Sequence, residues 1–384
     1  MSSGAAAAAL PLAGTRVVSL GHTLPGLYCL ALLRDLGAEV LRIERVAKPG
    51  AAPGPYAALD GLFPMRSLRA GTSGCQLDLR DPRGREVFLR LAARADAVLE
   101  GFRPGVAARL GVDFETLARE RPALVYAAVS GYGQTGPLAQ RAGHDLNYLA
   151  ETGVLGLANP VGLPGTTFAD GLAGLSAALN LVAALAQAAR SGRGCFLDLA
   201  IVDAPLFLIA SELERHWQSG ESRGPGDTHL TGRYPWYAVH ESADGGHVAV
   251  GAVEPHFHAA LVERLGLAEP GAAQFAEGEA LARSRERTRA AFAARTRAET
   301  EALLGGADAC VSSVRSIAEV AASPLCERAR RPGRAPDESL VRSPVRLGDA
   351  PLAAERGTAR VLADAGFGAQ ELDRLRDAGA IGGD

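Results

Sequence analysis

A histidine and an aspartate lie side by side where a helix is expected to begin. His144 and Asp145 follow Gly143, and an apolar helix is expected from Leu146 onward. A histidine in this position can act as a general base close to the positive end of a helix dipole. The same two residues can also be a helix cap and a hydrogen-bonded histidine without a chemical role. The local pattern leaves both interpretations open.

Two further carboxylates lie at expected helix starts. Asp170 begins a long Ala-rich helix, among side chains too small to shield its charge. Glu254 follows an apolar run and precedes Pro255. Both can be ordinary acids of a first helical turn. Alternatively, Asp170 projects into a cleft, and Glu254 orients a histidine across that cleft.

Glycine is concentrated directly after one apolar run, in the segment Gly131-Tyr-Gly-Gln-Thr-Gly-Pro137. Glycines after a strand indicate that the backbone approaches another group closely. Gly131, Tyr132 and Gly133 are therefore candidate contacts to a ligand. A surface loop is the alternative interpretation.

The elements that would position these residues alternate between strands and helices. Short apolar runs followed by helical segments predict βαβ units, which pair in parallel with right-handed crossovers. The predicted fold is therefore α/β, an open, doubly wound, Rossmann-like sheet that binds ligands beyond the carboxyl ends of its strands. The expected strands are 15–20, 39–43, 97–100, 124–130 and 195–200, and the expected helices include 26–36, 82–95 and 114–120.

The character of the chain changes after about Glu214, which predicts a second, smaller α+β domain. The large domain is expected over 1–215, a polar linker over 216–231 and the small domain over 232–328. Within the small domain we expect strands at 234–239 and 247–250, and helical segments at 256–265 and across 277–304. A connector rich in Pro and Arg, 329–349, precedes a short closing helix at 371–378.

Composition argues against several classes of function. The 384-residue chain has a net charge of −3, so no general attraction to nucleic acid or an anionic membrane is expected. Its five cysteines lack metal-site spacing and are expected to be reduced thiols of a cytoplasmic protein. The first residues lack the basic region of a signal peptide, and the apolar segment 171–189 is expected to be a buried helix rather than a membrane span. No dinucleotide-binding glycine turn occurs at 21–26.

In their order along the chain, these motifs resemble the class III CoA-transferase superfamily (CaiB/BaiF type), and within it the α-methylacyl-CoA racemases. The likeness extends over roughly residues 10–327, and Gly143-His-Asp-Leu-Asn-Tyr148 is similar to the racemase branch in particular. The other segments that carry it are Leu12-Ala-Gly-Thr-Arg-Val-Val, Leu36-Gly-Ala-Glu-Val-Leu-Arg-Ile-Glu44, Leu77-Asp-Leu-Arg-Asp-Pro82, Phe102-Arg-Pro-Gly105, Ser130-Gly-Tyr-Gly-Gln-Thr-Gly-Pro137, Ala249-Val-Gly-Ala-Val-Glu-Pro-His-Phe257 and Ala307-Asp-Ala-Cys-Val311.

The resemblance implies a racemase or epimerase that moves the proton next to the carbonyl of an acyl thioester, such as a 2-methylacyl-CoA. It makes His144 and Asp170 the two acid–base groups on opposite faces of that carbon, with Glu254 holding His144 in its productive tautomer. Backbone N–H groups at the helix start near Asp145 would stabilise the enolate oxygen. This 1,1-proton transfer would need no metal and no redox cofactor.

The phosphates of CoA would require cations, and the resemblance makes Arg42, Arg45 and Arg103 the candidates. The chain departs from the family on this side of the site. It has Arg69-Ala-Gly-Thr72 where Asn-Arg-Gly-Lys is usual, and Gly101 and Thr166 stand where Asn is common. These departures leave open a shortened thiol carrier, such as the phosphopantetheinyl arm of a carrier protein.

Two other functions stay open. An acyl-CoA:carboxylate CoA-transferase would use Asp170 as a nucleophile that forms covalent intermediates. Such transferases commonly carry a mobile Gly-rich loop in the small domain, and no comparable run of glycines occurs between Ser219 and Pro255. The second alternative is an inactive paralogue that binds a thioester or a partner protein.

The resemblance also implies an interlocked homodimer, in which each subunit passes through a hole in the other. The large domain would then include a C-terminal segment, residues 335–384, that returns to it. The site would lie between the large domain of one subunit and the small domain of its partner.

Overall fold

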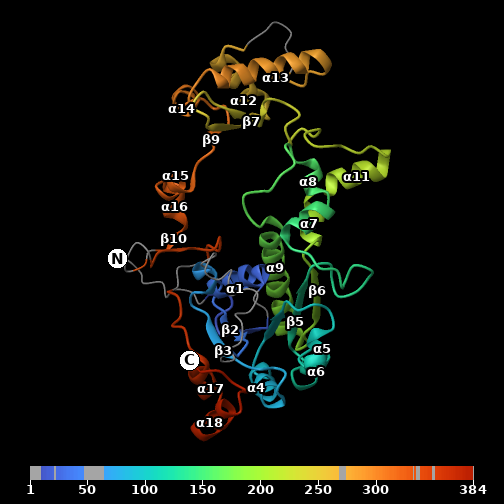
Figure 1. The fold of residues 1–384 in the computed structure, drawn as a ribbon, viewed down its shortest axis with the longest axis vertical. Coiled ribbons are helices and arrows are strands. Elements are labelled where there is room, and N and C mark those ends of the chain that lie inside the picture. Colours follow the sequence, from blue (N-terminus) through green and yellow to red (C-terminus); the bar gives the residue numbers. More distant parts are fainter. Residues whose placement is uncertain are drawn as a thin grey trace. The chain divides into compact units, whose positions relative to one another are not determined.

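The computed structural model describes residues 10–20, 23–46, 65–267, 274–331, 333, 338–347 and 351–383 (Figure 1). The chain divides into two compact units. Unit 1 comprises 1–149, 165–208 and 329–384, and unit 2 comprises 150–164 and 209–328. Each unit is described by itself below.

Unit 1 is built on a six-stranded sheet in which every pair of neighbouring strands is parallel. The strand order is β3-β2-β1-β4-β5-β6, so the winding reverses between β1 and β4. This confirms the predicted doubly wound α/β sheet, whose ligands are expected beyond the carboxyl ends near the reversal. The strands are β1 (Arg16–Ser19), β2 (Glu39–Glu44), β3 (Ser73–Gln76), β4 (Ala97–Glu100), β5 (Val125–Ser130) and β6 (Phe196–Ala200).

The strands at the centre of the sheet are apolar because helices cover both of its faces. Every residue of β4 and β5 is buried, whereas β6 at the edge has none that is fully buried. A continuous apolar strand with both faces covered is typical of parallel sheets. The core on one face joins the sheet to α4 (Pro82–Ala92), through residues that include Val98, Tyr126 and Phe88.

Two helices of unit 1 pack closely against each other. They are α1 (Leu24–Asp35) and α9 (Phe168–Ser191), and α9 also contacts β5 and β6 (Figure 1). A Cβ at Gly174 would lie 2.5 Å from Tyr28 Cβ and 2.8 Å from the carbonyl oxygen of Pro25, so only glycine allows this approach. By length and composition alone, α9 is the one described helix that could cross a membrane. In this structure it packs against the sheet, α1 and α10 (Asp203–Leu208).

The C-terminal segment completes unit 1 by packing on the β3 edge of the sheet. The helix α17 (Thr358–Asp364) contacts β3, and Thr358 Oγ1 accepts a hydrogen bond from the backbone N–H of Gln76 at 3.0 Å. The backbone N–H of Asp78 donates to the carbonyl of Ala380, just beyond α18 (Ala369–Asp377). The other elements of unit 1 are α3 (Arg66–Arg69), α5 (Val106–Leu110), α6 (Phe114–Glu120), α10 (Asp203–Leu208), β10 (Arg330–Arg331) and β11 (Leu340–Val341).

Unit 2 is an α+β structure around a small antiparallel sheet, as predicted for the second domain. The strands β7 (Tyr237–Glu241), β8 (His247–Gly251) and β9 (Val311–Ser313) lie in that order. The core includes Trp236 and Phe292, and the ring of Trp236 stacks on Tyr234. The helices are α8 (Val154–Leu157), α11 (Ala210–Ser219), α12 (Pro255–Leu265), α13 (Gly278–Ala293), α14 (Arg297–Leu304), α15 (Ile317–Ala321) and, at the boundary with unit 1, α16 (Pro324–Ala329).

The charged stretch 277–304, expected to be helical, contains the two helices α13 and α14. The first helix ends at Ala293. Thr296 caps the second, because its side chain accepts from the backbone N–H of Glu299 while the Glu299 side chain accepts from the backbone N–H of Thr296. This reciprocal capping box fixes a helix start in the middle of the predicted segment.

Candidate functional site

The starts of two helices of unit 1 are joined by a hydrogen bond between Asp145 and Asp170. The helix α7 (Asp145–Glu151) begins one residue after His144, and Asp170 lies in the first turn of α9. A carboxylate oxygen of Asp145 accepts a hydrogen bond from the backbone N–H of Asp170 at 2.9 Å. The turn that carries His144 is therefore anchored to the turn that carries Asp170.

The carboxyl group of Asp170 lies in an environment that favours its protonated form. Burial raises its pKa to about 6, and the nearby negative charge of Asp145 contributes to the rise. A carboxyl group that titrates close to neutral pH can accept a proton in one half-reaction and return it in the other. Partial burial also leaves part of the side chain accessible to a substrate.

His144 combines a fixed backbone with an exposed side chain. Its N–H donates to Asn147 Oδ1 at 3.0 Å, and its carbonyl accepts from the backbone N–H groups of Asn147 and Tyr148 at 2.8 and 3.2 Å. These contacts are those of a helix N-terminus, which agrees with the interpretation of His144 and Asp145 as part of a helix cap. They leave the imidazole accessible, because all of them are made by the backbone.

Two glycines of the predicted site make room for a tyrosine ring. A Cβ at Gly131 would lie 2.7 Å from Tyr148 Oη, and one at Gly143 would lie 2.8 Å from Tyr148 Cε1. The ring of Tyr132 meets that of Tyr148 edge-on, with centroids 5.4 Å apart. The close approach inferred from the glycine at 131 is thus made by a side chain of the same unit.

The glycine-rich segment is then held against the edge strand β6. Gly133 has a left-handed backbone, with a φ of 86°. The next residue, Gln134, donates its backbone N–H to both carboxylate oxygens of Asp198, at 2.9 and 3.0 Å. A positive φ of this kind favours glycine, so Gly133 has a conformational reason to be glycine.

The three candidate arginines differ in whether their guanidinium groups already bind other residues of the protein. Arg42, on β2, is 8% exposed; it donates from Nε to Thr72 Oγ1 at 2.8 Å and pairs with Glu44. Arg45, just beyond β2, and Arg103, beyond β4, are exposed. The charge of Arg42 is therefore partly neutralised, whereas Arg45 and Arg103 present their guanidinium groups to solvent.

Two of the departures from the family pattern have local partners. Thr72 occupies the place where Lys is usual, and its hydroxyl group accepts from Arg42 and donates to the carbonyl of Arg69. Gly101 occupies the place where Asn is usual, and a Cβ there would lie 2.9 Å from Thr23 Oγ1. Thr72 thus contacts β2 from its position just before β3, and Gly101 lies just beyond the carboxyl end of β4.

Glu254 belongs to unit 2, where it precedes the first residue of α12. Its backbone is extended, its side chain is exposed, and it forms no side-chain hydrogen bond to the helix start. The carboxylate lies close enough to Cys310 to help raise the pKa of that thiol, after burial and Asp308. The interpretation of Glu254 as a simple capping side chain therefore has no hydrogen bond to support it.

Glu100 is a buried acid at the carboxyl end of β4 that the sequence analysis did not single out. It ends β4, is 4% exposed, and accepts from the backbone N–H of Phe102 at 2.6 Å. Burial raises its pKa to about 7, against the opposing effect of that hydrogen bond. The signal in the sequence was an acid at the end of an otherwise apolar strand, directly before Phe102-Arg-Pro-Gly105.

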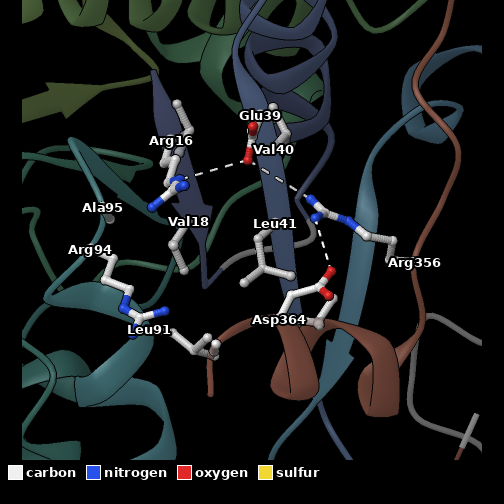
Figure 2. Close-up of a pocket in the computed structure, with 13 residues that line it drawn as sticks. Arg16, Val18, Glu39, Val40, Leu41, Leu91, Arg94, Ala95, Arg356 and Asp364 are labelled. Atoms are coloured by element: carbon white, nitrogen blue, oxygen red, sulfur yellow. Dashed lines mark hydrogen bonds and ion pairs between the residues drawn. The ribbon is translucent and has the colours of Figure 1, made fainter. Parts of the chain in front are cut away.

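A separate pocket of about 130 Å³ lies at the amino ends of β1 and β2, away from the predicted site residues (Figure 2). Its floor includes Val18 and Leu41. At its rim Glu39 pairs with Arg16 and with Arg356, at 3.7 and 3.9 Å (Figure 2). These ion pairs tie the C-terminal segment to the sheet, a structural role.

Within the described part of the chain, no three His, Cys, Asp or Glu side chains are grouped so that they could hold a metal ion. The groups available for chemistry at this site are an imidazole, the carboxyl groups of Asp145 and Asp170, and the N–H groups of two helix starts. Together they can accept and donate protons beside a developing negative charge.

Comparison with known proteins gives the family. The family model for CoA-transferase family III matches residues 12–363, and the chain belongs to this family. Mouse α-methylacyl-CoA racemase is 34% identical over 379 residues, which cover 95% of this chain and 96% of the relative. The human α-methylacyl-CoA racemase is 35% identical over 81% of this chain and 79% of its own length.

Transferases are also similar to the chain. The acetyl-CoA:oxalate CoA-transferase of Acetobacter aceti is 32% identical over 59% of each protein. Among solved structures, a CAIB/BAIF family protein from Brucella suis has a TM-score of 0.73 and 26% identity, over 92% of this chain and 99% of that chain. Rv3272 from Mycobacterium tuberculosis has a TM-score of 0.73 and 27% identity, over 88% and 93%. The family thus supports a racemase or a CoA-transferase.

Proposed function

We propose that this protein is an acyl-thioester racemase or epimerase that acts by 1,1-proton transfer on a 2-methylacyl-CoA or a similar thioester. The observation that carries the proposal is the hydrogen bond from the backbone N–H of Asp170 to Asp145, the neighbour of His144. It anchors the helix start next to His144 to the helix start that carries Asp170. The similarity to mouse and human racemases over most of the chain supports the same reaction.

In the proposed reaction His144 removes the α-proton from one face of the substrate carbon. The electron pair of the broken C–H bond moves to the thioester oxygen and gives an enolate, which N–H groups at the start of α7 stabilise. The carboxyl group of Asp170 then delivers its proton to the opposite face, and a new C–H bond forms. The reverse reaction exchanges the two roles.

The carrier of the acyl group would be held on the carboxyl side of the sheet. Arg45 and Arg103 are exposed there and suit phosphate groups, while Arg42 contributes less because Glu44 already pairs with it. The changes at Thr72 and Gly101 make a shortened carrier the alternative. Equal turnover of CoA and pantetheine thioesters would support the shortened carrier, and strict dependence on the nucleotide would reject it.

The proposal is tested by α-hydrogen exchange in D₂O with a panel of 2-methylacyl-CoA thioesters and no acceptor acid. The wild-type protein should incorporate deuterium at the α-carbon and invert its configuration. His144→Ala and Asp170→Asn should each slow inversion by about 10²- to 10⁴-fold, the range typical of a lost acid–base group. Absence of exchange with every thioester in the wild type would contradict the proposal.

A CoA-transferase that uses Asp170 as its nucleophile is the second candidate. It is favoured by the similarity to the oxalate transferase and by the partial accessibility of Asp170. Hydroxylamine would trap an acyl-aspartyl adduct at Asp170 in a transferase and none in a racemase. A protein that binds thioesters but shows neither exchange nor an adduct would be an inactive paralogue.

A further inference from the structure

The hydroxyl group of Tyr148 fixes the residue that precedes the proposed base. Tyr148 Oη donates a hydrogen bond to the carbonyl oxygen of Gly143 at 2.7 Å. The backbone N–H of the same residue donates to the carbonyl of His144 at 3.2 Å. Tyr148 therefore holds both peptide units that flank the Cα of His144.

The position of the Tyr148 ring is itself determined by its surroundings. The residue is 6% exposed, and its ring fills the space that side chains at Gly131 and Gly143 would otherwise occupy. The ring of Tyr132 packs against it edge-on. Closely packed rings of this kind have few alternative rotamers, so the hydroxyl group is directed at a defined point.

The other side of the same turn is anchored to α9. Asp145 follows His144, and its carboxylate holds the backbone N–H of Asp170 at 2.9 Å. The backbone at 144 thus lies between two attachments, one to Tyr148 and one to the helix of the second acid–base group. Only the imidazole itself is left exposed to a substrate.

We propose that Tyr148 is a positioning residue that holds the backbone of His144 so that its imidazole meets the substrate on the face opposite Asp170. The inference rests on the proposed proton transfer for its functional meaning. Its structural part, that the Tyr148 hydroxyl fixes the conformation of His144, holds for the ligand-free protein as well. A small displacement of an acid–base group is costly, because proton transfer requires hydrogen-bond distances.

The test is Tyr148→Phe, which keeps the ring and removes only the hydrogen bond to Gly143. We expect kcat for α-proton exchange to fall about 10- to 100-fold while KM stays unchanged, because substrate contacts are retained and only the base is misplaced. The ¹H–¹³C resonance of the His144 ring, assigned by its loss in His144→Ala, should shift in the ligand-free variant.

The matched control is Tyr126→Phe in β5. Tyr126 is 1% exposed, and its hydroxyl group donates to the carbonyl of Val112 at 3.2 Å, so this variant also loses a buried tyrosine-to-carbonyl bond. It should lower the melting temperature without changing kcat or the His144 resonance. Equal losses of kcat in the two variants would mean that Tyr148 acts through stability alone and would overturn the inference.

A second variant reaches the same contact from the opposite side. Gly131→Ala would place a methyl group 2.7 Å from Tyr148 Oη and displace it. The His144 resonance should shift as in Tyr148→Phe. The kcat of the double variant should be no lower than that of the single variant with the lower kcat. Full additivity would overturn the inference.

The experiment separates this inference from the proposed function. If the wild-type protein exchanges no α-proton, the proposed function fails, and the His144 resonance alone then decides whether Tyr148 fixes that residue. If exchange occurs but Tyr148→Phe keeps the wild-type kcat and resonance, the inference fails and the proposed function stands.

Discussion

Asp145 has two effects on Asp170 that act in different ways. Its carboxylate accepts the backbone N–H of Asp170, which places the second helix, and its charge opposes ionisation of the Asp170 side chain. Burial is the larger cause of the raised pKa of about 6. A substitution that keeps the hydrogen bond and removes the charge can therefore separate the two effects.

Asp145→Asn makes that separation, because the amide oxygen can still accept from Asp170. With the negative neighbour removed, the ionised form of Asp170 is less disfavoured, so its pKa should fall from about 6 toward the ordinary value. For the substrate isomer whose proton Asp170 removes, the acidic limb of the plot of kcat/KM against pH should move to lower pH. A limb at the wild-type position would show that the charge of Asp145 has no part in tuning Asp170.

Glu100 predicts a pH dependence of stability rather than of rate. Its pKa is about 7 in the folded protein, against 4.5 for an ordinary glutamate, so the folded state binds the proton more tightly. Stability from this group is present in full below pH 4.5 and is lost as the pH rises through 7, by about 3 kcal/mol. Glu100→Gln should remove this loss. In urea denaturation, the difference in stability between the variant and the wild type should therefore favour the variant more at pH 8 than at pH 5.

Much of the site could be inferred from residue types and order, whereas its contacts could not. His144, Asp145 and Asp170 were predicted together through the family resemblance. The bond between Asp145 and Asp170 spans 25 residues and depends on how two helices meet, which no local pattern encodes. The role of Tyr148 could not be predicted either, because its ring fills space left by Gly131, which is not adjacent in the sequence.

At the scale of elements, the contact between α1 and α9 sets where Asp170 lies. It depends on Gly174, whose missing side chain lets α9 approach Tyr28 and Pro25. Asp170 lies one helical turn before that contact, so any displacement of α9 there is transmitted to the proposed site. Rigid helices transmit such shifts because cores are closely packed.

Gly174→Ala should therefore destabilise unit 1 by about 1–3 kcal/mol, because its methyl group would overlap Tyr28 and the backbone of Pro25. The control is Gly171→Ala in the same helix, where a Cβ would have no neighbour within 4 Å. That variant should instead gain about 0.5–1 kcal/mol from the restricted unfolded state. Chemical denaturation of both variants measures the difference, and equal effects would contradict the steric explanation.

The strands and helices predicted from sequence correspond to observed elements where the hydrophobic pattern is uninterrupted. The strand expected at 97–100 is β4, and the strand expected at 124–130 contains β5. The stretch 277–304, expected to be helical, contains α13 and α14, and the side-chain cap at Thr296 marks the start of the second helix. The helix α17 was missed because its contacts are with β3, far away in the sequence.

At the scale of the whole molecule, the family resemblance predicts an interlocked homodimer, with the site shared between subunits. Sedimentation or light scattering at micromolar concentration should give the mass of two chains of 39.7 kDa. Because threaded subunits cannot separate without local unfolding, dilution should leave the mass unchanged over hours. A monomer that persists at all concentrations would contradict the prediction and would require each chain to carry a complete site.

The attachment of the C-terminal segment to β3 has a consequence for biosynthesis. The hydrogen bond between Gln76 and Thr358 joins residues 282 positions apart, so β3 emerges from the ribosome long before its covering helix exists. During that interval the outer edge of the sheet is open to pairing with other chains. Chaperone protection of the nascent protein should accordingly be needed until translation is nearly finished.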